Sequence, residues 1–211
     1  MSIRTLPRML GTALSVAIVA SCTDKATPTF DDQAAHVAEV AAAGGVVDSI
    51  LPIAEHLRRF RASLPKTDTL RHASPTMAAL VERWATAIGT NDATDLNAMI
   101  MDRAEFAWLY YSESPMSKPP YEAPPELLWG QLLASSNKGA AKLVSRFGGS
   151  RLTASRLRCA APPDTQGVNL LYNKCEVRLS APGKQTIEGV MFGTILEHLG
   201  RFKFVGLSTS L

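Results

Sequence analysis

Six side chains of the sequence have the chemical groups that acid–base catalysis requires. They are Asp102, Glu105, Tyr110, Tyr111, Glu188 and His198. In such a reaction a carboxylate or a histidine moves the proton, and a neighbouring donor stabilises the developing oxyanion. Asp102 and Glu105 are three residues apart, a spacing that allows one shared helix face. No spacing joins all six into a recognised catalytic set, so the sequence alone assigns them no reaction.

The same residues have simpler structural interpretations. We expect Asp102 and Glu105 to be surface carboxylates, and the two tyrosines to lie at the edge of the core with hydrated hydroxyl groups. His198 stands beside the tight turn HLGR and is expected to be exposed. Three tryptophans are candidates for lining the pocket of a small hydrophobic ligand, with core packing as the simpler interpretation: Trp84, Trp108 and Trp129.

The sequence lacks the motifs of several other chemistries. It has no GxSxG, Walker loop, HExxH or dinucleotide-binding glycine pattern. It has no CxxC, and its four histidines are scattered, so we expect no metal site and no cofactor. The net charge is +3, and +1 without Arg4 and Arg8, which is too small for binding along a phosphate backbone. Nucleic acid is therefore not an expected partner.

The N-terminal region has the layout of an export signal. Arg4 and Arg8 precede an apolar run of eleven residues, 10–20, and small residues follow. A helix that spans a membrane needs about 20 apolar residues, so this run is too short to be one. Residues 1–21 are therefore predicted to be a cleaved signal peptide.

The segment 19–22, VASC, resembles the lipobox of bacterial lipoproteins, in which the cysteine is acylated and becomes the first residue after cleavage. The resemblance implies that membrane lipid on Cys22 anchors the protein in the bacterial cell envelope. Thr23 stands where the enterobacterial signal for inner-membrane retention has aspartate, which favours the periplasmic face of the outer membrane. An ordinary secretory signal with an incidental cysteine is the alternative.

Two further cysteines, Cys159 and Cys175, are predicted to form a disulfide, because an exported protein meets an oxidising compartment. If they lie opposite each other in an antiparallel hairpin, Arg158 opposes Glu176, which is a favourable pair. The same register gives one apolar and one repulsive pair: Leu157 with Val177, and Arg156 with Arg178.

The first part of the chain reads as a linker region followed by helices. Residues 22–48 are predicted to be a flexible tether in which QAAHVAEVAAA is a marginal helix. Residues 49–71 hold a short amphipathic helix and a linker, and 72–211 form the main domain. Residues 104–111 fit a helix or a strand, and the five prolines of 112–125 predict an ordered, irregular loop. Apolar spacing predicts three helices in the main domain: 75–89 with Ser74 as N-cap and Pro75 as first residue, one from about Thr94, and 126–147.

After Gly149 the apolar period changes from helical to alternating. Four antiparallel strands joined by short turns are predicted: 151–160, 169–180, 185–198 and 201–209. The third strand is apolar on both faces, which is typical of a central strand in a strongly curved sheet. The expected fold class is therefore α+β.

This order of elements is similar to that of the nuclear-transport-factor-two-like (SnoaL-like) superfamily over about residues 72–211. The segments RAEFAWLYY, WGQL, SNKG, RFGG and RFKFV also resemble bacterial lipoproteins of that superfamily. The resemblance implies helices packed on a strongly curved antiparallel sheet that forms a cone. The sequence departs from the pattern because only AEFAWLYY and the proline-rich loop stand where the superfamily has its first hairpin.

The resemblance leaves the function open, because the superfamily includes ketosteroid-isomerase-like enzymes, dehydratases and non-catalytic modules. Our first hypothesis is a membrane-anchored, non-catalytic binding or interaction module. A small-molecule isomerase or lyase with a carboxylate in the cone cavity is the first alternative. The second is a structural envelope protein that forms a homodimer through the outer face of its sheet, where the predicted register places four residues: Tyr172, Lys174, Glu176 and Arg178.

Overall fold

The computed structural model describes residues 30–44 and 51–209 of the chain. The chain divides into two compact units, with the boundary between Ser49 and Ile50. In the first unit the described residues form helix α1, Phe30–Ala42. This helix covers the marginal helix that the sequence allowed within the predicted tether. The predicted signal peptide and Cys22 lie outside the described residues.

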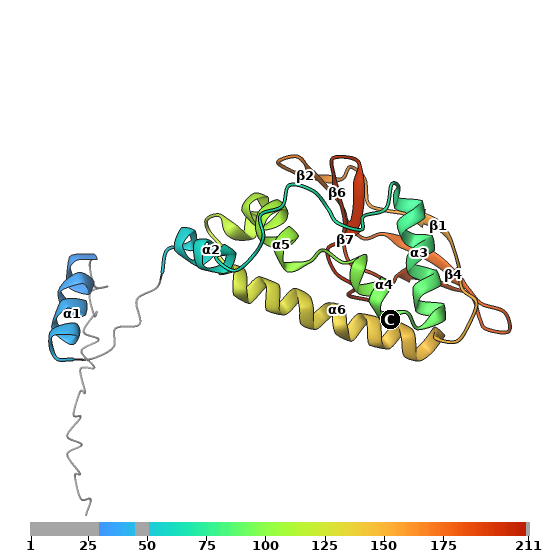
Figure 1. Cartoon of the computed structure of the whole chain (residues 1–211), viewed down its shortest axis with the longest axis horizontal. Coiled ribbons are helices and arrows are strands. Elements are labelled where there is room, and N and C mark those ends of the chain that lie inside the picture. The colour runs from blue at the N-terminus through green and yellow to red at the C-terminus, as the bar shows by residue number, and fades with distance from the viewer. Residues whose placement is uncertain (1–29, 45–50, 210–211) are drawn as a thin grey trace, which may run out of the picture. The chain divides into compact units, whose positions relative to one another are not determined.

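The second unit begins with its helices (Figure 1). They are α2 (Ile53–Arg61), α3 (Met77–Thr90), α4 (Ala93–Ala98), α5 (Arg103–Glu105), a π-helical turn (Phe106–Tyr110), two 3-10 turns (Tyr111–Glu113 and Pro115–Ser117) and α6 (Pro125–Phe147). The segment that fitted a helix or a strand is thus helical, and the predicted long helix 126–147 is confirmed. α2 lies beside the N-terminal half of α6, and α3 lies beside its C-terminal half.

The predicted boundaries of α3 are wrong at both ends. The N-cap is Thr76, whose Oγ1 accepts a hydrogen bond from the amide of Ala79. Ser74 instead exchanges two backbone hydrogen bonds with Phe202, so the chain enters the helix from a β-bridge. The helix runs one residue past Gly89, and its C-cap is Asn91 in the left-handed region. Gly89 allows a close approach of another segment, because a Cβ there would lie 2.4 Å from the carbonyl oxygen of Ser150.

The strands form two antiparallel sheets, where we predicted four long strands. They are β1 (Thr153–Arg158), β2 (Asp164–Gln166), β3 (Asn169–Tyr172), β4 (Glu176–Ser180), β5 (Ile187–Val190), β6 (Ile195–His198) and β7 (Arg201–Phe204). One sheet has the order β1-β4-β5 and the other β2-β3-β6-β7. The predicted strand 185–198 is therefore wrong as one central strand, because its first half is an edge strand and its second half is central in the other sheet.

The predicted strands 169–180 and 185–198 are the two arms of one long hairpin. The strand pairing is interrupted in both arms at positions that lie opposite each other. Pairing runs from Tyr172↔Ile195 in one sheet to Glu176↔Val190 in the other. The residues between these pairs number three on one arm and four on the other, so the register shifts by one residue. Lys174 lies at the break in the left-handed region, with φ 49°. The chain passes from one sheet to the other at this break.

The disulfide between Cys159 and Cys175 closes the end of the β1–β4 pair, as predicted. Arg158 opposes Glu176, which confirms that part of the register. The predicted clash of Arg156 with Arg178 does not occur, because a bulge shifts the register and Ser155 takes the position opposite Arg178. Arg156 sits in the bulge with φ 53°.

The apolar residues form two clusters in this unit. The first surrounds Trp84 of α3 and includes Leu143 of α6 and Phe192 from the hairpin break. The second surrounds Phe106 and takes in Phe60 of α2. α2 therefore packs on the same unit as the main domain through its one buried aromatic side chain.

Candidate functional site

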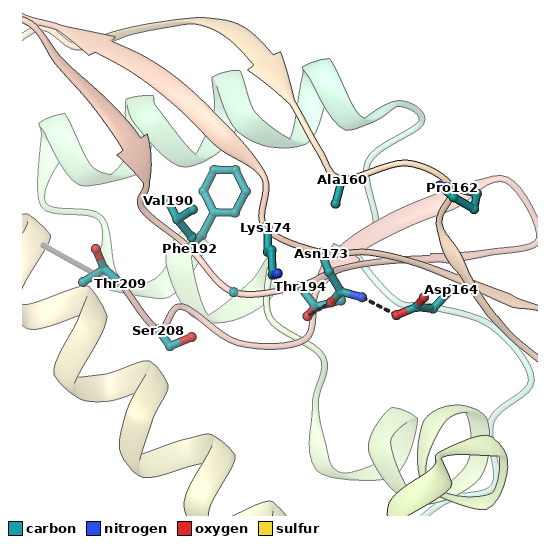
Figure 2. Close-up of a pocket in the computed structure, with 11 residues that line it drawn as sticks. Ala160, Pro162, Asp164, Asn173, Lys174, Val190, Phe192, Thr194, Ser208 and Thr209 are labelled. Carbon is teal, nitrogen blue, oxygen red and sulfur yellow. Dashed lines mark hydrogen bonds between the residues drawn. The ribbon is translucent and has the colours of Figure 1, made fainter.

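A groove of about 720 Å³ lies where the two sheets meet, and we call it the junction groove (Figure 2). Its walls come from the β1–β2 connection, from both arms of the broken hairpin and from the chain after β7. The lining residues are Ala160, Pro162, Asp164, Asn173, Lys174, Val190, Phe192, Gly193, Thr194, Ser208 and Thr209. The volume is within the range of about 300–1,000 Å³ that small-molecule sites occupy.

Three polar side chains are bonded in a row along one side of the junction groove (Figure 2). Thr194 Oγ1 donates a hydrogen bond to Asn173 Oδ1 at 2.6 Å, and Asn173 Nδ2 donates to Asp164 Oδ2 at 2.6 Å. The backbone of Asn173 is also fixed, because its carbonyl accepts a hydrogen bond from the amide of Ala160. The Asp164 carboxylate is therefore oriented, while its residue remains exposed.

Lys174 is the cation of the junction groove. It follows Asn173 and precedes the buried, disulfide-bonded Cys175, so its backbone is held on both sides. Its side chain extends toward the middle of the groove (Figure 2). It forms no hydrogen bond or ion pair with any residue in 51–209. A left-handed conformation costs a non-glycine residue of order 1–3 kcal/mol, and such residues cluster at functional sites.

The floor of the junction groove is built by a close approach of two backbone segments. Gly193 donates a backbone hydrogen bond to Gly206 at 3.0 Å, and Val205 donates to Thr194 at 2.8 Å. A Cβ on Gly193 would lie 2.7 Å from the carbonyl oxygen of Gly206, so only glycine permits this contact. Phe192, the residue before Gly193, is fully buried, and its ring packs against Trp84 in the core.

Glu105 is buried, so the prediction of a surface carboxylate is wrong. Its carboxylate accepts hydrogen bonds from the Lys203 ammonium at 2.8 Å and from the backbone amides of Arg71 at 2.6 Å and Asp102 at 2.7 Å. Side-chain exposure is 0% for Glu105 and 2% for Lys203, so the pair is excluded from water. Asp102 does not share a helix face with Glu105. It is the N-cap of α5 and forms a capping box with it, with an outer ion pair to Arg71.

The two candidate tyrosines are held by the protein, one more deeply than predicted. Tyr111 is fully buried, and its hydroxyl donates to the carbonyl of Ala123 at 2.7 Å. Burial raises the pKa of this hydroxyl, and the nearby charge of Glu126 raises it further. Tyr110 is half-buried, and burial raises its pKa as well. The prediction of a hydrated hydroxyl is therefore wrong for Tyr111.

His198 is buried rather than exposed. Its Nδ1 lies 2.7 Å from Asn169 Oδ1, and its Nε2 lies 3.1 Å from the backbone oxygen of Asp68. The amide of Asn169 is itself oriented, because its Nδ2 donates to the carbonyl of Leu109. The imidazole thus joins three chain segments, and the turn that follows it does not expose it.

The three candidate tryptophans do not line one pocket. Trp84 is buried in the first apolar cluster, where it packs edge-on against Phe192 with ring centroids 5.1 Å apart. Trp129 contacts Phe106 in the second cluster. Trp108 lines a shallow hollow beside α2, with the Arg61 guanidinium 4.1 Å above its ring. Core packing describes the first two.

The four residues predicted for the outer sheet face do not share one strand. Tyr172 belongs to β3, where its hydroxyl donates to Glu197 at 2.7 Å. Glu176 and Arg178 belong to β4 in the other sheet, and Lys174 lies at the break between them. Arg178 pairs with Glu188 of β5 at 2.7 Å, which lowers the pKa of that exposed carboxyl.

The junction groove was not predicted from the sequence. Its one visible signal is the polar run Tyr172–Lys174 before Cys175, which interrupts an otherwise apolar alternation. The groove also includes Asp164, from the neighbouring strand β2, and Ser208, from the chain after β7. A pattern search along the chain does not connect these residues.

Within the described ranges, no group of three or more His, Cys, Asp or Glu side chains is placed to hold a metal ion. None of the helices formed by those residues is both long and apolar enough to cross a membrane. Comparisons of the chain with protein-family models, with curated proteins and with solved structures find no match.

Proposed function

We propose that this protein is a lipid-anchored protein of the bacterial cell envelope whose α+β domain binds a small ligand in the junction groove without changing it chemically. Lys174 carries the proposal. It is a cation that lines a groove, is fixed by the disulfide beside it and is bonded to no side chain or backbone group of 51–209. A cation placed in this way is available to a ligand.

The arrangement of the acid–base candidates supports binding over catalysis. Glu105 is neutralised by Lys203, and the imidazole of His198 contacts two oxygen acceptors of the protein. Neither side chain lines the junction groove. An isomerase or lyase would need such a group to face its substrate. The one carboxylate in the groove lining, Asp164, is exposed and accepts a hydrogen bond from the Asn173 amide, so we propose binding and do not extend the proposal to either activity.

The anchor is supported by the N-terminal sequence. The segment 19–22 follows an export-like leader, which favours acylation of Cys22, and Thr23 favours the periplasmic face of the outer membrane. Mass spectrometry of the full chain purified in detergent from bacterial membranes tests this. We expect an N-terminal fragment that begins at Cys22 and carries acyl chains. An unmodified cysteine in that fragment would refute the anchor.

We further propose that the domain belongs to the nuclear-transport-factor-two-like class, with both sheets curved into a cone. The element order supports this, because α3 and α4 precede the long α6 and the strands follow. The broken hairpin, whose arms run from one sheet into the other, is compatible with one strongly bent surface. An experimental structure with the strands in one flat layer would contradict it.

Ligand-observed NMR on the full chain in detergent, with a library of polar metabolites, tests binding in the groove. We expect at least one compound to bind, and Lys174→Gln to weaken it. Lys138→Gln is the matched control, because Lys138 is an exposed lysine on α6, outside the groove. No bound compound, or equal binding to both variants, would refute the proposed role of the groove.

A further inference from the structure

The junction groove carries two opposite charges that come from different elements. Asp164 begins β2, and Lys174 lies at the break between β3 and β4. Both residues are exposed, and neither is in an ion pair with the part of the chain that follows residue 50 in the structure. Asn173 holds the Asp164 carboxylate through Oδ2, so the charge keeps its place in the lining.

These charges select against ligands of a single sign. A simple anion attracted to Lys174 would be repelled by Asp164. A simple cation attracted to Asp164 would be repelled by Lys174. A molecule with a carboxylate at one end and an ammonium group at the other complements both. Charge arrangement of this kind sets the specificity of a site more than its raw affinity.

The rest of the lining is suited to apolar groups. Val190 is half-buried, Ala160 and Pro162 are exposed, and all three present apolar groups to the groove. Ser208 is exposed and adds a hydroxyl near the close approach to Gly193. A hydroxyl both donates and accepts, so it can bond to a peptide amide or carbonyl.

We infer that the ligand is a zwitterionic amino acid or short peptide with apolar side chains, with its carboxylate on Lys174 and its ammonium group on Asp164. This inference rests on the ligand-binding role proposed above. It names the chemical class of ligand for the same groove.

Isothermal titration of the full chain in detergent tests the inference with three matched probes. They are leucyl-leucine, which is a zwitterion, its N-acetyl derivative, which is an anion, and its C-terminal amide, which is a cation. Each blocked probe loses one exposed ion pair, and such a pair is worth up to about 1 kcal/mol, or about fivefold in affinity. We therefore expect leucyl-leucine to bind about fivefold more tightly than either derivative.

Two variants assign each end of the ligand to its residue. Lys174→Gln should remove the preference for a free carboxylate, so that leucyl-leucine and its amide bind equally. Asp164→Asn keeps an oxygen for the Asn173 amide and should remove the preference for a free ammonium group. Lys138→Gln and Glu176→Gln are controls that change the same charges outside the groove lining and should keep both preferences.

The outcomes separate this inference from the function that it rests on. Equal binding of all three probes, or no binding of any, would overturn the zwitterion assignment. If a compound from the metabolite library still binds in a Lys174-dependent way, the binding role stands with another ligand class. If that screen is also negative, both proposals fail.

Discussion

The buried cluster around Glu105 and the junction groove use the same types of residue in opposite ways. Glu105 and Lys203 are excluded from water and form an ion pair with each other. Two backbone amides donate further hydrogen bonds to the Glu105 carboxylate. Asp164 and Lys174 are exposed and unpaired with each other. Burial of a charge is costly unless the protein supplies its partner. Among the described residues, the most deeply buried acid is therefore structural, while the exposed charges of the junction groove are available for binding.

The largest effect is expected when the buried pair is broken. Lys203→Met would leave the Glu105 carboxylate without its ammonium partner in a site closed to water. Removal of one partner from a buried ion pair typically lowers the free energy of unfolding by about 3–5 kcal/mol. Urea denaturation of the full chain, followed by circular dichroism, measures this loss. Lys138→Met, at an exposed position of α6, is the control and should change the free energy by less than about 0.5 kcal/mol.

A loss of under about 1 kcal/mol for Lys203→Met would show that the pair is hydrated. The distinction between the two regions would then fail, because Glu105 would no longer differ from Asp164 in its access to water.

The second largest effect concerns the covalent link beside the groove. Cys159 and Cys175 are separated by 16 positions, and a disulfide closing a loop of that length stabilises by about 3 kcal/mol in the chain-entropy model. The double change Cys159→Ser and Cys175→Ser should lower the free energy of unfolding by about this amount. Reductant should destabilise the unchanged protein and leave the double variant unaffected. Equal sensitivity to reductant in both would show that another process is being measured.

The sequence predicted elements well where one local signal decided them. α6 has a proline at its first turn, an apolar stripe and a glycine after Phe147, so its bounds could be predicted. The Arg158↔Glu176 pair followed from the two cysteines alone. The hairpin break could not be predicted, because the polar run Tyr172–Lys174 is too short to separate two strands by itself and the left-handed Lys174 is not a glycine that would mark a turn.

The sites were less predictable than the elements, because burial is set by distant partners. Residue type and local spacing predict that Glu105 is on the surface. In the fold, Lys203, which is 98 positions later, forms an ion pair with it and is buried with it. His198 sits next to a turn, yet Asp68 and Asn169 enclose its ring from two other segments. Such contacts are tertiary, and residue type with local spacing does not encode them.

A smaller effect on stability is expected for the two charges of the junction groove. Lys174→Gln and Asp164→Asn should each leave the free energy of unfolding within about 0.5 kcal/mol of the unchanged protein, because exposed charges that form no ion pair contribute little to folding. Asparagine at position 164 also keeps an oxygen for the hydrogen bond from the Asn173 amide. The same urea titration measures it. A loss above about 2 kcal/mol for either variant would mean that the charge supports the fold, and its assignment to ligand binding would be wrong.

The smallest effect on stability is expected at a third type of site, an exposed pair with good geometry. Glu55 on α2 accepts hydrogen bonds from Arg58 and Arg59 at 2.7 Å, and these bonds hold its pKa at about 2 instead of 4.5. A lowered pKa stabilises the folded state above pH 4.5, and this contribution is lost as the pH falls from 4.5 toward 2.

Carboxyl-detected NMR titration of the full chain measures this pKa directly. Arg58→Gln should raise the pKa of Glu55 toward 4.5, because the hydrogen bond from Arg58 makes the largest contribution to lowering it. Added salt should raise it as well, since an exposed pair is screened. The free energy of unfolding of Arg58→Gln at neutral pH should differ little from that of the unchanged protein, because water already solvates both members of the ion pair. If Arg58→Gln destabilised the protein as much as Lys203→Met, exposure would not separate the charges that hold this fold from those that are free to act.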